Sequence, residues 1–216
     1  MTAAGERPVC GFVGWGPESA ALLDALRGTD PERAPHAVAL AGAGAPPEVA
    51  RTVPSVEALF ASAQLIVAEG GAAALEPHLA TIRLAISDRH VLVLLGSGWS
   101  LEPLLTHLHE RKLVRCLLLP AQSGTAGSLA FHPTPYFTAS ELAAFKATFA
   151  HLELCVELRD ERHFELVQGL ADFAPAVFYT VLEAMGDSMV MMGFSRDAAV
   201  NLVASLLHGT AQRVLD

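Results

Sequence analysis

Apolar and polar residues alternate along residues 1–158 with a period that changes from segment to segment. Short runs with apolar residues at nearly every position predict buried strands over 9–14, 37–42, 64–69, 90–96, 114–120 and 153–158. Between these runs, apolar residues three or four positions apart predict helices over 18–26, 55–63, 73–86, 100–110 and 139–152. Strands that are apolar on both faces and alternate with helices favour a mostly parallel sheet covered on both sides. We therefore expect an α/β, Rossmann-like doubly wound domain over residues 1–158.

The pattern changes after residue 158, where only helical periodicity remains. It predicts helices over 163–173, 176–194 and 195–215, with a break at Ala174-Pro175. Pro175 suits the first turn of a helix, and Ser195 suits an N-cap. Residues 159–216 are therefore expected to form a small all-helical module.

One face of this helical module carries a long apolar seam. Its members are four, three, four and three residues apart: Phe178, Leu182, Met185, Met189 and Met192. A module this small has little core of its own to cover such a seam. We expect a homodimer formed through residues 175–215, the alternative being that the seam packs on the first domain.

Composition limits the classes of partner. Hydrophobic residues make up 52% of the 216 residues and charged residues 17%, which is typical of a globular protein. The net charge of -9 excludes attraction to nucleic acid or anionic lipid, and no apolar run reaches the roughly 18–20 residues of a membrane span. Three cysteines without paired spacing and a start without signal-peptide character favour a cytoplasmic protein.

The first predicted strand ends in a glycine-rich turn, "GFVGWGPES" at 11–19. Gly14 and Gly16 meet the need of a dinucleotide-binding turn for a tight bend and close backbone approach. Pro17, however, removes an N–H donor, and Glu18 puts a carboxylate at a helix N-terminus where a phosphate would bind. Whether the turn still binds a dinucleotide is left open. The candidate pyrophosphate-binding residues are Gly14, Trp15, Gly16, Pro17, Glu18 and Ser19.

Three segments, in order, resemble the pyrroline-5-carboxylate reductase family. They are "GFVGWG" at 11–16, "LLGSGWSLEPL" at 94–104 and "EAMGDSMVMMGFSRDAAVNLVASLLHGTAQRVL" at 183–215. The resemblance covers nearly the whole chain and implies a Rossmann-like domain followed by a dimerisation module. It also implies NADP or NAD as cofactor and a cyclic imine or related small substrate, with a place in secondary metabolism.

The resemblance adds residues to the candidate cofactor site and shows where this chain departs from the family. By position it adds Glu69, Gly70, Gly98, Pro120, Ala121 and Gln122. The family's lysine after the third strand is absent here, and so is its asparagine near residue 121. Phe173 stands in a stretch where the family has small residues. The family's Pro-Gly-Gly-Thr-Thr turn has no counterpart before Asp216, so we expect a rebuilt substrate pocket.

Reduction of an imine requires a bound hydride donor and a proton source for the nitrogen. Glu183 on the predicted dimer helix and Asp172 in the predicted loop before Pro175 are the candidate catalytic residues. Each also fits an ordinary surface position. The histidines show no metal-ligand spacing, so no metal site is predicted. The alternative function is a cofactor-free isomerase or cyclase, or a small-molecule-binding or regulatory dimer on the same fold.

Overall fold

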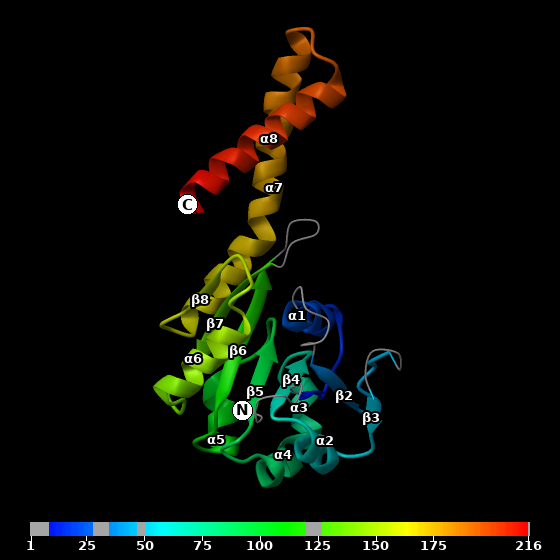
Figure 1. Cartoon of the computed structure of the whole chain (residues 1–216), viewed down its shortest axis with the longest axis vertical. Helices are drawn as coiled ribbons and strands as arrows, with labels where there is room; N and C mark the ends of the chain where they lie inside the picture. The colour runs from blue at the N-terminus through cyan, green and yellow to red at the C-terminus, as the bar shows by residue number, and fades with distance from the viewer. Residues whose placement is uncertain (1–8, 28–34, 47–50, 120–126, 216) are drawn as a thin grey trace. The chain divides into compact units, whose positions relative to one another are not determined.

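An eight-stranded sheet with the order β3-β2-β1-β4-β5-β6-β7-β8 organises the N-terminal part of the computed structural model (Figure 1). The structure describes residues 9–27, 35–46, 51–119 and 127–215. The strands are β1 (Val9–Phe12), β2 (His36–Leu40), β3 (Arg51–Val53), β4 (Leu65–Glu69), β5 (Val91–Leu95), β6 (Leu113–Leu119), β7 (Ser128–Pro133) and β8 (Cys155–Glu157). Neighbouring strands pair in parallel except β6 and β7. The order reverses at β1 and β4, which is where ligands bind in open α/β sheets.

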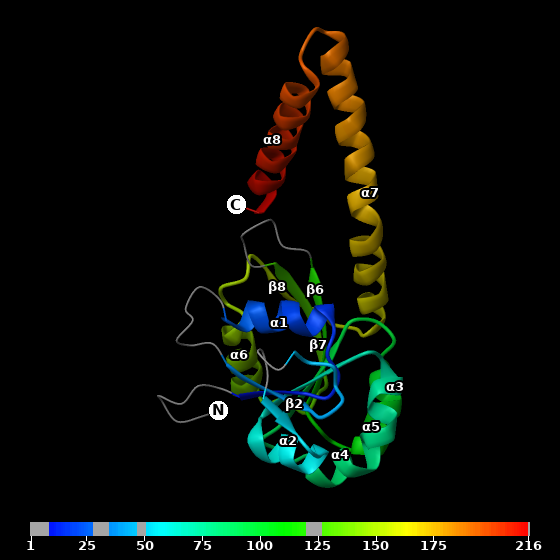
Figure 2. The same ribbon diagram turned by 90° about the vertical axis from the view of Figure 1, so that its right-hand side faces the viewer.

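Helices cover both faces of this sheet, as Figure 2 shows. On one face lie α1 (Pro17–Arg27) and α6 (Ala139–Thr148), whose buried side chains share one hydrophobic core. On the other lie α2 (Val56–Ser62), α3 (Ala72–Leu75), the 3₁₀ helix η1 (Glu76–His78), α4 (Leu79–Ala85) and α5 (Leu101–Leu108). The predicted doubly wound, mostly parallel architecture is confirmed.

Some elements differ from the prediction. Strands β3 and β7 were not predicted; β3 has three residues at the sheet edge, and β7 ends in Pro133, which weakens its strand signal. The helix predicted over 73–86 is divided, because Pro77 lies in the η1 segment between α3 and α4. These differences leave the strand order around β1 and β4 unaffected.

Two long helices follow: α7 (Arg162–Met191) and α8 (Arg196–Leu215). The predicted break at Pro175 is wrong, because the proline lies inside α7. Proline removes one backbone hydrogen bond, and the other turns of a 30-residue helix keep theirs. At α8 the predicted N-cap is confirmed, since the Ala198 N–H donates to Ser195 Oγ at 3.4 Å. No helix in the described ranges is long and apolar enough to cross a membrane.

The chain divides into two compact units between Gln168 and Gly169. The predicted boundary after residue 158 therefore lies inside the first unit. The first turns of α7 belong to that unit because Phe164 is fully buried against Leu117 and Ala130 of the sheet. In the second unit, Ala199 and Val203 of α8 are buried, and an ion pair joins Arg196 to Asp187 of α7.

His90 is a buried histidine whose contacts fix its protonation state. The Ser87 N–H donates to Nδ1 at 2.9 Å, and Nε2 lies 2.9 Å from the Phe60 carbonyl oxygen, to which it donates. Because Nδ1 accepts from the Ser87 N–H, it carries no proton, and the neutral ring has its proton on Nε2, beside which Arg89 Nε also lies at 3.3 Å. Burial, assisted by the charge of Arg89, lowers the pKa of His90 below its ordinary 6.5.

This lowered pKa predicts a pH-dependent stability. The unfolded chain binds the proton more readily, so the contribution of His90 is complete above about pH 6.5 and falls as the pH drops towards the folded pKa. We expect the free energy of unfolding, measured with urea, to fall by up to about 1.4 kcal/mol per pH unit below pH 6.5. His90→Gln should flatten this slope, whereas replacing the exposed His107 by Gln should leave it unchanged. Equal slopes in wild type and His90→Gln would contradict the assignment.

Candidate functional site

The turn between β1 and α1 lies against the end of β4. The Val13 N–H donates to the Val67 carbonyl oxygen at 2.9 Å, which brings the two strand ends together. A Cβ atom on Gly14 would lie 2.5 Å from the Glu69 carbonyl oxygen, and one on Gly16 would overlap the Glu69 carboxylate. Both glycines are therefore required by close approach.

The Glu69 carboxylate occupies the N-terminus of α1. Its Oε1 accepts from the Glu18 N–H at 3.2 Å, and its Oε2 accepts from the Ser19 N–H at 2.7 Å. These N–H groups have no partner within the helix, and the helix dipole favours an anion beside them. Ser19 is fully buried. The anion-binding end of α1 thus holds a carboxylate supplied by the chain itself.

The second carboxylate of the turn, Glu18, points elsewhere. Its oxygens lie where a Cβ on Gly96 would be, just beyond the end of β5. Gly96 has φ +77°, so the position favours glycine on backbone grounds as well. The sequence indicated a competing carboxylate at Glu18, but the group that takes the α1 donors is Glu69.

The loops after β4 and β5 meet at the same edge of the sheet. Gly70 and Gly98 have φ values of +104° and +78°, and the Ala72 N–H donates to the Gly98 carbonyl oxygen at 3.2 Å. Trp99 is buried and donates from Nε1 to the Leu95 carbonyl oxygen at 2.7 Å, which makes it a core residue. Glu69, Gly70 and Gly98 therefore gather beside the β1–α1 turn.

The remaining predicted residues are placed as follows. Trp15 is half-buried, with its ring edge-on to Phe12 at 4.8 Å. Asp172 and Glu183 are exposed on α7 in the second unit, and Asp172 lies inside the helix, where a loop was expected. The catalytic roles of Asp172 and Glu183 stay predictions. Three predicted residues lie outside the described part of the chain: Pro120, Ala121 and Gln122.

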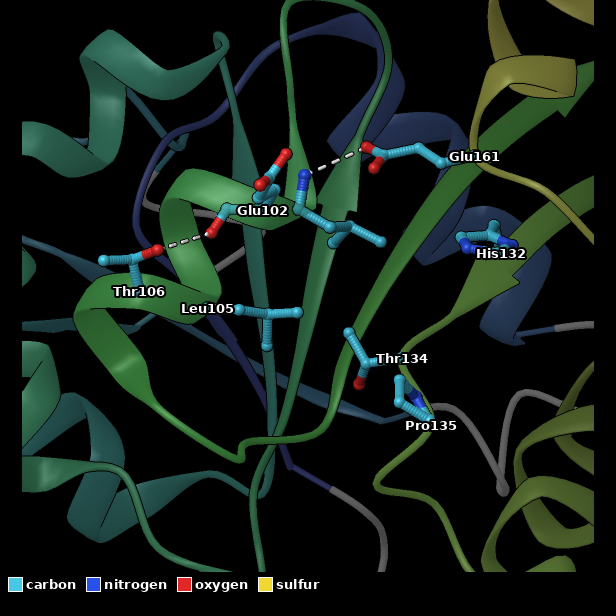
Figure 3. Close-up of a pocket in the computed structure, with 8 residues that line it drawn as sticks. Glu102, Leu105, Thr106, His132, Thr134, Pro135 and Glu161 are labelled. Carbon is cyan, nitrogen blue, oxygen red and sulfur yellow. Dashed lines mark hydrogen bonds between the residues drawn. The ribbon is translucent and has the colours of Figure 1, made fainter.

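A solvent-open pocket of about 480 Å³, which was not predicted from the sequence, lies between α5 and β7 (Figure 3). Glu161 Oε1 accepts there from the Leu101 N–H at 2.9 Å, at the start of α5. His132 donates from Nδ1 to the Leu158 carbonyl oxygen at 2.7 Å. Because α5 and α1 cover opposite faces of the sheet, this pocket is separate from the β1–α1 turn.

Neither the buried cysteine Cys10 nor a cluster of metal-binding side chains provides a further reactive site in the described residues. Burial raises the pKa of the Cys10 thiol to about 12, so this cysteine is protonated at neutral pH and is a poor nucleophile. Within the described ranges, no three His, Cys, Asp or Glu residues gather as metal ligands.

Comparison with known proteins identifies relatives over both parts of the chain. Residues 161–216 match the family model described as pyrroline-5-carboxylate reductase dimerisation. Pyrroline-5-carboxylate reductase 2 from Rattus norvegicus is 24% identical over 152 residues, which cover 66% of this chain and 47% of that protein. The chain spans about half the length of the curated relatives it matches.

Two solved structures share the fold. Plasmodium falciparum pyrroline carboxylate reductase with NADP bound has a TM-score of 0.72 and 20% identity, with 97% of this chain and 79% of that chain covered. An imine reductase from Myxococcus stipitatus in complex with NADP+ has a TM-score of 0.63 and 16% identity, with coverage of 96% and 76%. The fold is thus a Rossmann-like sheet followed by a helical segment that matches the dimerisation family model. The chain is therefore similar to pyrroline-5-carboxylate reductases, through the dimerisation family model at residues 161–216 and through a shared fold over most of its length.

Proposed function

We propose that this protein is an NAD(P)H-dependent reductase of a cyclic imine or a related small substrate. The observation that carries the proposal is the glycine turn leading into the α1 N-terminus at the β1–β4 reversal of the sheet. The similarity to pyrroline-5-carboxylate reductases supports it, as do structural neighbours solved with NADP. These relatives favour a reductase over a redox-neutral enzyme on the same fold.

The backbone of the β1–α1 turn fits a dinucleotide, but one side chain, Glu69, occupies the donors that a pyrophosphate would use. Gly14 and Gly16 allow close approach, and the Glu18 and Ser19 N–H groups are placed as anion donors. The Glu69 carboxylate uses the same donors, so a pyrophosphate binds only where that carboxylate gives way. NADP or NAD would lie across the β1–α1 turn and the Gly70 and Gly98 loops.

When bound, the reduced cofactor supplies the hydride. The α1 N–H groups would hold and orient it, and the buried Ser19 hydroxyl donates to the Gly14 carbonyl oxygen across the same turn at 3.5 Å. The imine nitrogen needs a proton, and we propose Glu183 or Asp172 as its source through a side-chain carboxyl oxygen. Glu183→Gln and Asp172→Asn each remove that acid while keeping side-chain size.

Isothermal titration with NADPH, NADH, NADP and NAD at low salt tests the cofactor. We expect at least one to bind more tightly than roughly 100 micromolar, about -5.5 kcal/mol. Turnover would then be followed by NAD(P)H absorbance with cyclic imines as acceptors. Folded protein that gives no heat with all four dinucleotides would contradict the proposal and favour redox-neutral chemistry or simple binding.

We also propose that the protein acts as a homodimer formed through residues 175–215. The dimerisation match over 161–216 supports this, and so does the apolar exposure of the second unit. Large exposed apolar side chains of α7 and α8 include Phe178, Tyr179, Met185, Leu202 and Leu206. A surface of this kind is typical of a subunit interface.

A further inference from the structure

We propose that Glu69 is an autoinhibitory residue, whose carboxylate holds the phosphate-binding donors of α1 until a dinucleotide displaces it. The inference rests on the proposed function and adds a residue that sets the strength of cofactor binding. Glu69 comes from β4, about fifty residues away in sequence from the helix that it caps.

The first step is that carboxylate and phosphate require the same donors. Oε1 and Oε2 of Glu69 accept from the Glu18 and Ser19 N–H groups, at 3.2 and 2.7 Å. A pyrophosphate bound at the turn would place its oxygens on these N–H groups. The carboxylate also fills the space that the missing side chain of Gly16 leaves open. The two anions are therefore mutually exclusive at this position.

The second step is that the carboxylate can leave without unfolding the sheet. The Glu69 backbone is held in β4, paired with Leu95 of β5, whereas its side chain is only half-buried. Among the described residues, this carboxylate forms no ion pair, so its hydrogen bonds to α1 are what hold it. Rotation of the side chain releases these donors while the strand stays in register.

The third step is the cost that this contact imposes on the ligand. When a ligand must first displace an internal group, its apparent dissociation constant is the intrinsic constant divided by the fraction of molecules in which the site is open. Hydrogen bonds to a charged acceptor are stronger than neutral ones, so the capped form predominates without ligand. The contact thus stabilises the free protein and weakens its affinity for the dinucleotide.

The test compares Glu69→Ala and Glu69→Gln with wild type in two measurements, dinucleotide affinity by titration and melting temperature without ligand. We expect Glu69→Ala to bind NADPH or NADH about tenfold more tightly, or about 1.4 kcal/mol, while melting at a lower temperature. Glu69→Gln should fall between, since its amide oxygen still accepts from one N–H. Glu76→Gln, an exposed carboxylate seven residues away with the same charge change, should alter neither value.

An autoinhibitory role predicts that Glu69→Ala raises the dinucleotide affinity and lowers the melting temperature. If Glu69 only stabilised the fold, the substitution would lower both the affinity and the melting temperature. Wild type that binds a dinucleotide as tightly as both Glu69 variants would overturn the inference and leave the proposed reductase standing. If neither wild type nor variants bind, both proposals fail together. If Glu69→Ala does not fold, Glu69→Gln decides, and inorganic pyrophosphate should raise its melting temperature more than that of wild type.

Discussion

Replacing Phe178 and Met185 together by glutamate is expected to convert a dimer into a monomer. The two side chains lie seven residues apart on one face of α7 and are 61% and 42% exposed. Burying a large apolar side chain contributes roughly 1.5–3 kcal/mol. Each dimer would lose four such side chains and gain four carboxylates, so the dissociation constant should rise at least about 1000-fold.

Size-exclusion chromatography with light scattering measures the change directly. Wild type should have twice the chain mass of 22.8 kDa, and the double variant should have the chain mass alone. The control is Thr180→Glu, which adds a carboxylate on the opposite side of α7 and should remain dimeric. A double variant that is still dimeric and folded would show that another surface joins the subunits.

Much of the first unit was predictable because buried parallel strands are apolar on both faces. The strands β1, β2, β4, β5 and β6 all have this character, and the sequence located each within a few residues. Strand β3 was not found because three residues are too few to show a period. In α7, local propensity at Pro175 predicted a break, but one missing hydrogen bond does not end a helix of this length.

The candidate site was predictable only as far as it is local in sequence. Gly14, Gly16 and Ser19 follow from the turn itself, and the structure places them beside the predicted loops after β4 and β5. The role of Glu69 could not be predicted, because it depends on the adjacency of β1 and β4 and on the direction of one side chain. The resemblance selected position 69 but gave no reason to expect a carboxylate bound to α1.

Glu161→Ala is expected to destabilise the first unit strongly, although the residue is not part of the hydrophobic core. Its carboxylate accepts from Arg115 Nη1 at 3.0 Å and from the Leu101 N–H at 2.9 Å. Arg115 is 2% exposed, its guanidinium lies 4.1 Å from the ring centre of Phe164, and its Nε has no hydrogen-bond partner among the residues that the structure describes. Removing Glu161 leaves the buried Arg115 guanidinium without one of its two carboxylate partners, which lowers the free energy of unfolding by about 3 kcal/mol.

A neighbouring acid provides the contrast. Glu165 binds Arg115 Nη2 at 2.8 Å, but its side chain is 61% exposed, so Glu165→Ala should cost less than about 1 kcal/mol. Urea unfolding at pH 7.5 measures the stability of both variants. We expect a lower midpoint urea concentration and an unchanged dependence of the unfolding free energy on urea. Equal losses in the two variants would mean that solvent compensates Arg115 when Glu161 is removed.

Arg115→Met separates the charge from the packing. The apolar side chain fills a similar space against Phe164 and needs no partner, so it removes the buried cation that makes Glu161→Ala costly. We therefore expect Arg115→Met to be less destabilised than Glu161→Ala, and Glu161→Ala to cost little more when added to Arg115→Met. Full additivity of the two substitutions would show that Glu161 stabilises the fold through the start of α5 and not through Arg115.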